Sequence, residues 1–225
     1  ALESNDEIES LLYDYLDSDA QSDNDDLVGS VFLRRSTDSG ATWEYLEEVE
    51  YTYHDGTDDH GSAGDLRTVV KKRKVGETWK TLSKTYYRYY KSGDNKGDAH
   101  LIQFLVAPQD YADMEGESLD PTTATDTQLE TRASYYFEHD GNGRVEKMVS
   151  GRGTVTKTYA YDTREGSDSD ESLNEWTLKT TETRADGSHT ITYTNHLGKT
   201  ILRDTGTDAD NQVEYWEFDD TGNYL

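Results

Sequence analysis

Cysteine is absent from this sequence of 225 residues, which excludes disulfide bonds and thiolate metal sites. No apolar run approaches the length of a membrane span, no signal peptide is visible, and Ala1 is not an initiator methionine. We therefore expect a mature product or an excised fragment without membrane insertion. Tyr224-Leu225 falls where a new strand should begin, which favours a segment cut from a longer repeat array.

Basic residues are scarce, with 22 Lys and Arg against 47 Asp and Glu, and the net charge is −25. This balance argues against nucleic-acid partners, which bind to a basic face, and against anionic membranes. It suits high-salt or calcium-containing surroundings, where ions screen self-repulsion. The only basic run, residues 71–74, alternates across both faces of a predicted strand, so we expect it to pair with acidic residues of the protein.

Large aliphatic residues are also scarce. Leu, Ile, Val and Phe make up about 16% of the chain, a share typical of disordered proteins at this charge. The sequence has instead 17 tyrosines and 4 tryptophans, which form strands and have a large area to bury. We therefore predict an ordered all-β protein whose core contains more Tyr, Trp and Thr than aliphatic side chains.

The first residues have a different pattern from the rest of the chain. Residues 5–17 place apolar side chains on one helical face, which predicts a short amphipathic helix. The helix and the acidic loop that follows it form a region 1–26, and residues 27–225 are predicted to form consecutive antiparallel β-hairpins. The helical face consists of Ile8, Leu11, Leu12, Tyr15 and Leu16.

Strand signals dominate from there onwards. Aromatic and polar residues alternate with period two between Trp43 and Tyr53. Residues 66–75 and 78–91 predict a hairpin closed at Gly76-Glu77. In its second arm, alternation predicts one face with Trp79, Tyr87 and Tyr89, and the other with Leu82, Tyr86 and Tyr90.

Residues 107–132 interrupt the strands and mark a possible break in the array. They contain both prolines, and we predict short helices near 109–115 and 123–131. Gly and Asn supply the positive backbone angles that tight turns need. On this basis turns are predicted at 140–143, 150–153, 186–187, 195–198 and 219–222.

Three turns follow an aromatic-rich strand and share one pattern: Asp or Asn, two residues, Gly, and a polar residue. The third copy departs from the first, because Asn223 stands where the first has arginine. A recurring strand–turn–strand unit indicates an architecture of stacked hairpins. The residues predicted to shape these turns are Asp140, Gly143 and Arg144; Asn195 and Gly198; and Asp219 and Gly222.

The unit resembles the RHS/YD-repeat family, named for tyrosine-aspartate repeats that end in Gly-Arg, as residues 140–144 do. Further stretches within 27–225, at 45–53, 63–66, 84–90 and 193–195, are similar to long RHS-repeat proteins of planctomycete-type bacteria. The resemblance implies a large secreted or surface-attached protein whose hairpins spiral into a β-shell, sometimes around a toxin domain. The toxin domain and the self-cleaving motif of that family are not visible here, so enclosure and self-cleavage do not carry over.

A second motif, from Ser36 to Trp43, matches the Asp-box pattern S-x-D-x-G-x-T-W of sialidase-like propellers. Asp38 is expected to accept backbone N–H bonds across the loop, Gly40 to allow the turn, and Trp43 to pack beneath it. A sialidase-like glycosidase is the catalytic alternative. Only one box is evident and no arginine triad can be placed, so we interpret the box as a structural turn and predict no catalytic residues.

Acidic loops are the candidate metal sites. Oxygen-rich loops suit Ca²⁺, but none matches the EF-hand pattern, which favours a solvated acidic surface, with a structural Ca²⁺ site as the alternative. His54 and His60 flank Asp55, Asp58 and Asp59 at a spacing of no known metal site, which favours a polar loop. The three acidic groups are Asp17, Asp19, Asp23, Asp25 and Asp26; Asp162, Asp168, Asp170 and Glu171; and Asp204, Asp208, Asp210 and Glu214.

We predict a non-catalytic structural segment of an extracellular or cell-surface RHS/YD-repeat protein, acting as shell, fibre or adhesin. Its expected partners are neighbouring repeats or identical subunits, and open strand edges predict head-to-tail filaments. The alternative is a glycan- or protein-binding module, possibly stabilised by calcium, that uses exposed tyrosines at 86–90. No cofactor other than this possible Ca²⁺ is expected.

Overall fold

The computed structural model describes residues 7–16, 26–164, 172–207, 209–219 and 221–225. Thirteen strands and two short helices follow one another along these residues. They are β1 Ile8–Tyr15, β2 Val28–Ser36, β3 Glu44–Tyr53, β4 Leu66–Val75, β5 Thr78–Tyr89, β6 Ile102–Val106, α1 Pro108–Gly116, α2 Asp126–Leu129, β7 Tyr135–His139, β8 Val145–Ser150, β9 Val155–Thr163, β10 Leu178–Arg184, β11 His189–Thr194, β12 Thr200–Thr207 and β13 Asp210–Tyr215.

All thirteen strands belong to a single sheet, in which each strand pairs with its neighbours in sequence. Every pairing is antiparallel, from β1 with β2 to β12 with β13. The sheet is therefore an uninterrupted meander of hairpins, which confirms the predicted all-β class and hairpin arrangement. The hairpin closed at Gly76-Glu77 is confirmed as well, since β4 and β5 flank it.

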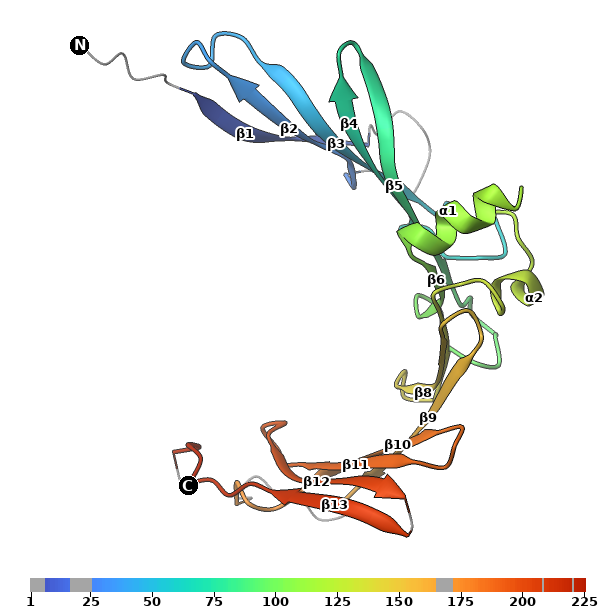
Figure 1. The fold of residues 1–225 in the computed structure, drawn as a ribbon, viewed down its shortest axis with the longest axis vertical. Helices are drawn as coiled ribbons and strands as arrows, with labels where there is room; N and C mark the ends of the chain where they lie inside the picture. The colour runs from blue at the N-terminus through green and yellow to red at the C-terminus, as the bar shows by residue number, and fades with distance from the viewer. Residues whose placement is uncertain (1–6, 17–25, 165–171, 208, 220) are drawn as a thin grey trace.

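The sheet curves like the letter C, with β1 and the C-terminal residues at its two ends (Figure 1). Helices α1 and α2 lie on the outer side of its middle part, next to β5 and β6 (Figure 1). The molecule exposes 13972 Å² of surface, about a third more than the roughly 10,400 Å² expected of a compact monomer of this mass. This excess agrees with a sheet that is one layer thick over most of its length.

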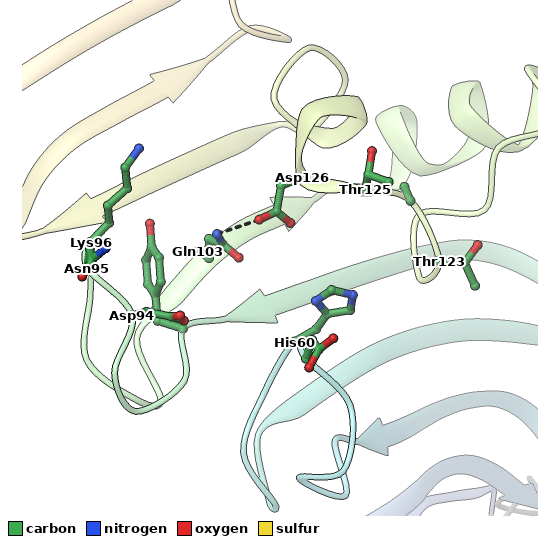
Figure 2. A pocket seen from close by; sticks show the side chains of 11 residues that line it. His60, Asp94, Asn95, Lys96, Gln103, Thr123, Thr125 and Asp126 are labelled. Carbon is green, nitrogen blue, oxygen red and sulfur yellow. Dashed lines mark hydrogen bonds between the residues drawn. The ribbon is translucent and has the colours of Figure 1, made fainter.

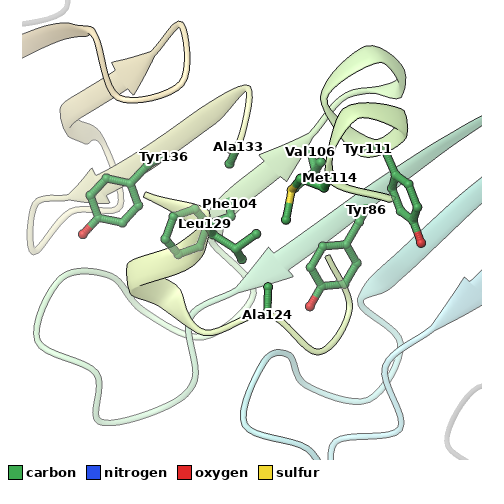
Figure 3. Packing of buried hydrophobic residues seen from close by; sticks show 9 residues of the cluster. All are labelled: Tyr86, Phe104, Val106, Tyr111, Met114, Ala124, Leu129, Ala133 and Tyr136. Atoms are coloured by element: carbon green, nitrogen blue, oxygen red, sulfur yellow. The ribbon is translucent and has the colours of Figure 1, made fainter. Parts of the chain in front are cut away.

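The main buried core lies between the helices and the middle strands (Figure 3). Tyr111 and Met114 of α1 and Leu129 of α2 cover side chains of β5, β6 and β7. Fully burying side chains of this size stabilises the fold by roughly 1.5–3 kcal/mol each. The cluster consists of Tyr86, Phe104, Val106, Tyr111, Met114, Ala124, Leu129, Ala133 and Tyr136.

Local chemistry explains where the helices begin. Pro108 occupies the first turn of α1, where a missing N–H leaves no hydrogen bond unmade. Thr125 caps α2 in a capping box with Gln128, in which each side chain binds the other residue's backbone N–H. The two helices confirm those predicted near 109–115 and 123–131, although α2 is only one turn long.

The predicted N-terminal helix is wrong, because Ile8–Tyr15 forms strand β1. The register pairs Leu11 with Leu33, Leu12 with Phe32 and Tyr13 with Val31 along the edge of β2. Apolar side chains on both faces of β1 thus find apolar partners, and its backbone gains a ladder of hydrogen bonds. A short helix in isolation would gain neither. The acidic residues 17–25 lie outside the described residues.

Of the predicted faces of β5, the groupings of Tyr86 with Tyr90 and of Tyr87 with Tyr89 are confirmed, but the placement of Trp79 and Leu82 is wrong. Lys71 pairs with Ser83 and Lys72 with Thr81, so Leu82 is an extra residue in β5. Such a β-bulge shifts the alternation by one position. Trp79 therefore shares a face with Tyr86, whereas Tyr87 lies on the opposite face.

These two faces differ in what covers them. The helix-bearing face carries Tyr86, Phe104 and Tyr136 beneath α1 and α2. The adjacent positions of the same strands, Tyr87, Leu105 and Tyr135, point to the other side. We call this second side the open face. On it, Tyr135 is 38% exposed and its ring stacks on Phe137 at 5.9 Å, so a row of aromatic and aliphatic side chains remains half-covered.

Charge is divided between strands and connections. The strands contain 15 of the 22 basic residues but only 13 of the 47 acidic ones. Cross-strand pairs balance them, as where Lys72 of β4 lies 2.7 Å from Glu50 and 3.4 Å from Glu48 of β3. This confirms that the basic run pairs within the protein. The large negative charge therefore resides in loops, helices and termini.

Candidate functional site

The turn at 140–144 is held by the Asp140 side chain. Its Oδ1 accepts hydrogen bonds from the backbone N–H groups of Asn142 and Arg144, both at 2.9 Å. The Asp140 N–H donates to the Arg144 carbonyl at 2.8 Å, and the Gly143 N–H donates to the Asp140 carbonyl at 2.9 Å. Gly143 has φ of 75°, a left-handed conformation that favours glycine.

The same geometry recurs in the two other turns. Oδ1 of Asn195 accepts from the N–H groups of Leu197 and Lys199, both at 3.0 Å. Oδ1 of Asp219 accepts from Thr221 and Asn223, both at 2.9 Å. Gly198 and Gly222 have φ of 73° and 84°. The three sequence repeats are thus three copies of one backbone structure.

The polar residue after each glycine explains the departure of the third copy. In the first turn, Arg144 Nε donates to Asp140 Oδ2 at 2.8 Å. In the third turn, Asn223 Nδ2 donates to Asp219 Oδ2 at 3.3 Å. Asparagine can therefore supply the donor that arginine supplies elsewhere. Hydrogen bonds from Thr221, and then from Asn223, lower the pKa of Asp219 to about 2.

All three turns lie on one edge of the sheet, which we call the turn edge, because each follows an odd-numbered strand of the meander. Neighbouring turns are in contact there. Lys199 Nζ donates to the carbonyl of Gly222 and lies 5.0 Å from the centre of the Phe218 ring. A Cβ at Gly222 would come within 2.8 Å of the same Nζ. Gly222 therefore allows the left-handed backbone of the turn and also leaves room for the Lys199 side chain of the neighbouring turn.

The Asp box lies on the opposite edge, between β2 and β3. Asp38 Oδ1 accepts from Ser36 Oγ at 2.7 Å and from the Thr42 N–H at 2.8 Å, while Oδ2 accepts from Thr42 Oγ1 at 2.7 Å. The Ser36 hydroxyl, followed by these Thr42 contacts, lowers the pKa of Asp38 to about 2. Gly40 has φ of 91° above Trp43, on whose ring Arg34 stacks at 4.3 Å. Every polar atom of the Asp38 carboxylate is thus used within the turn.

A pocket of about 560 Å³ with a mostly polar lining lies elsewhere in the molecule (Figure 2). Four segments that are distant in sequence form its walls: the 54–65 loop, the 90–101 loop, β6 and the connection between α1 and α2. The lining residues are Asp59, His60, Tyr90, Asp94, Asn95, Lys96, Gln103, Thr123, Ala124, Thr125 and Asp126.

A buried cation anchors one wall of this pocket. The Arg88 side chain is fully buried, and its NH1 lies 2.5 Å from Asp126 Oδ1. Its NH2 donates to the Ala124 carbonyl at 2.8 Å. Gln103 Nε2 donates to the other oxygen of Asp126 at 3.3 Å (Figure 2). The connection before α2 is thereby tied to β5 and β6.

Backbone contacts hold the two loops in place. The His60 N–H donates to Asp58 Oδ1, and the His60 carbonyl accepts from the Tyr89 N–H, both at 2.9 Å. The Lys96 carbonyl accepts from the His139 N–H at 2.7 Å. The Lys91 ammonium joins the loops, donating to the Gly56 carbonyl at 3.0 Å. The walls of the pocket are therefore held by contacts within the protein.

His60 points into the pocket from the wall opposite Asp126 (Figure 2). Burial lowers the pKa of its imidazole, and the charge of Arg88 lowers it further. The ring is therefore neutral at pH 7, with one nitrogen as a donor and the other as an acceptor. Within the described part of the chain, the Asp59 carboxylate and the Asn95 amide make no side-chain hydrogen bond, whereas the His60 ring interacts with the Asp59 backbone.

The two histidines do not form one site. The His54 ring is buried, with Nδ1 3.1 Å from Asp58 Oδ2 and Nε2 3.1 Å from the Tyr87 carbonyl. It braces the 54–65 loop against β5, whereas His60 faces the pocket. No group of three or more His, Asp or Glu side chains suited to a metal ion occurs among the described residues.

The acidic groups are spread over several places. Asp162 Oδ2 lies 3.2 Å from Lys179 Nζ, and Asp204 accepts from Asn211 Nδ2 at 2.9 Å. Asp210 and Glu214 both belong to β13, which pairs with the strand that contains Asp204, whereas Asp26 lies just before β2. Asp17, Asp19, Asp23, Asp25, Asp168, Asp170, Glu171 and Asp208 lie outside them.

The expectation of exposed tyrosines at 86–90 is wrong for Tyr86 and Tyr90, which are buried under the helices and the 91–101 loop. Sequence reasoning missed a second aromatic group on the helix-bearing face. Phe32 lies 5.3 Å from Tyr45 and 6.3 Å from Trp79, measured between ring centres. The three rings line a groove of about 420 Å³. Bulges in β3 and β5 bring them to one face, which simple alternation does not reveal.

Comparisons with protein-family models and with curated proteins gave no match to this chain. None of the helices in the described residues is long and apolar enough to cross a membrane.

Proposed function

We propose that this chain is a non-catalytic structural segment of an extracellular or cell-surface protein built from hairpin repeats of the RHS/YD type. Its role is to form a curved wall, as part of a shell, fibre or adhesin. The observation that carries the proposal is the single-layer meander with one turn structure repeated along the turn edge. Such a sheet grows by adding hairpins, and the turn at 219–223 contacts the preceding one through Lys199 and Gly222.

The open face supports a role within a larger assembly. Tyr135 and Phe137 stack on each other there and remain partly exposed. Exposed rows of this kind are usually covered by another protein layer. Neighbouring repeats or identical subunits are the proposed partners, and the acidic loops keep the outer surface soluble.

The test is surface labelling of intact cells that produce the parent protein. We expect an antibody raised against residues 27–225 to label unpermeabilised cells, and external protease to remove the signal. A strictly intracellular control protein should stay unlabelled. Labelling that appears only after permeabilisation would contradict the proposed location and with it the proposed function.

A further inference from the structure

The pocket between the 54–65 and 90–101 loops is a candidate ligand site. Its volume of about 560 Å³ falls within the range of small-molecule sites, about 300–1,000 Å³. The turns and hairpins that build the sheet do not require it, because its walls are long loops and the helical insertion. The hairpin repeat therefore does not account for the polar residues that line this pocket.

The charges in and beside the pocket are largely paired. Arg88 neutralises Asp126, and Lys96 Nζ lies 2.8 Å from Glu138 Oε1. Asp94 Oδ2 accepts a hydrogen bond from the backbone N–H of Lys91 at 2.7 Å. A strongly anionic ligand would meet the unpaired carboxylate at Asp59. The electrostatics therefore disfavour an anionic ligand, and the hydrogen-bonding groups of the pocket decide between the remaining classes.

The polar side-chain atoms of the pocket that remain available to a ligand include both hydrogen-bond donors and acceptors. The Asp59 carboxylate offers two acceptor oxygens. The Asn95 amide and the remaining atoms of the Gln103 amide offer donors and acceptors together, and neutral His60 offers the ring nitrogen that does not interact with the Asp59 backbone. Adjacent hydroxyl groups on one ring match this set, because each hydroxyl both donates and accepts. A carboxylate can receive two neighbouring hydroxyls, and an amide can bind two with one bond of each kind.

We propose that this pocket binds a neutral carbohydrate through Asp59, His60, Asn95 and Gln103. This assignment goes beyond the structural function proposed above and does not depend on it. Contacts within the protein hold the two loops, so a ligand that binds there has less loop conformational entropy to overcome. The site differs from the tyrosines at 86–90 that the sequence suggested, because it uses loop side chains and no exposed aromatic face.

The experiment is saturation-transfer NMR of the full chain with a panel of neutral mono- and disaccharides and their methyl glycosides at millimolar concentration. We expect transfer to a contiguous set of ring protons in at least one sugar. Asn95→Ala and Asp59→Ala should each weaken that binding at least tenfold, because each removes two hydrogen bonds to hydroxyls. Gln212→Ala, on exposed β13, is the matched control and should bind like the parent.

Melting curves of each variant verify that the fold is retained. No transfer to any sugar in the panel, or binding that survives both Asn95→Ala and Asp59→Ala in folded protein, would overturn the proposal. Parallel titrations with Ca²⁺ and with spermidine distinguish the other ligand classes. Binding of either cation at this site, lost in the same variants and without any sugar binding, would also overturn it. These outcomes do not change the expected surface labelling of cells, so the binding experiment and the labelling experiment test the two proposals separately.

Discussion

At the scale of single residues, a carboxylate or amide at the start of a turn replaces the ladder of hydrogen bonds that the strands lose. Asp140, Asn195 and Asp219 each bind two backbone N–H groups through one oxygen. This Asx-turn chemistry is local and needs no partner from elsewhere in the chain. The glycine three positions later is needed for a different reason, since its backbone is left-handed.

Gly143→Val tests that requirement. A β-branched residue at φ of 75° is strained, so we expect a loss of about 2 kcal/mol, or roughly 5 °C in melting temperature. The control is Gly141→Val in the same turn, where φ is not positive and an added Cβ would meet open space. Calorimetry of both variants decides the matter: equal melting temperatures would mean that the strain is not the reason for the glycine.

Asp219→Asn tests the contribution of the ionised carboxylate. The pKa of Asp219 is lowered from 3.8 to about 2 in the folded protein, so ionisation stabilises the fold above pH 3.8. This stability is lost as the pH falls from about 4 towards 2. The asparagine variant does not titrate, so the parent should melt higher than the variant at pH 7, and the gap should shrink by pH 2. A gap that is constant from pH 6 to pH 2 would refute the role of the charge.

At the scale of elements, the single turn α2 depends on its contacts with the sheet. Four residues are too few for a helix to persist by itself. The capping box orders its start, and Leu129 anchors it in the core beneath α1 and β6. Arg88 adds a charged link from β5 to Asp126, so the helix is positioned by a residue 38 positions earlier.

Asp126→Ala should cost about 3 kcal/mol of unfolding free energy, because it leaves the buried Arg88 cation without its carboxylate. This loss of unfolding free energy is at the lower end of the range for a broken buried ion pair. The Ala124 carbonyl and the Tyr86 hydroxyl still accept hydrogen bonds from the Arg88 guanidinium. Urea unfolding measures it. Asp113→Ala is the control: its partner Arg152 is exposed, so the expected loss is at most about 1 kcal/mol. Similar losses in both variants would rule out a special role for the buried pair.

At the scale of the whole molecule, the open curvature of the sheet distinguishes this chain from a compact domain. A compact chain of 225 residues has a radius of gyration of about 17 Å. Thirteen strands side by side in one layer span roughly 58 Å at about 4.8 Å per neighbouring pair, more than the roughly 44 Å diameter of a sphere with that radius of gyration. The two ends of the C, at β1 and at the C-terminal residues, lie on the same side (Figure 1).

X-ray scattering from a dilute solution should therefore give a radius of gyration well above about 17 Å. Measurements at several protein concentrations control for association through the open face, which would raise the value further as concentration increases. A value near 17 Å at low concentration would mean that the sheet folds back on itself, with its open face buried inside the molecule.

The sequence by itself determined the local features of this protein: the all-β class, the hairpin at Gly76-Glu77, the two short helices and the positions of the tight turns. These depend on contacts within a few residues, such as those between Asp140 and Arg144, and the residue types specify them directly. Only the tertiary structure decided the rest. Apolar spacing in residues 8–16 fits a helix as well as a strand, and the edge of β2 selected the strand. The bulge at Leu82 moved Trp79 to the face of Tyr86, and the pocket joined His60 to Asn95 and Asp126. Such outcomes depend on pairing between distant segments, whose free energy no local pattern contains.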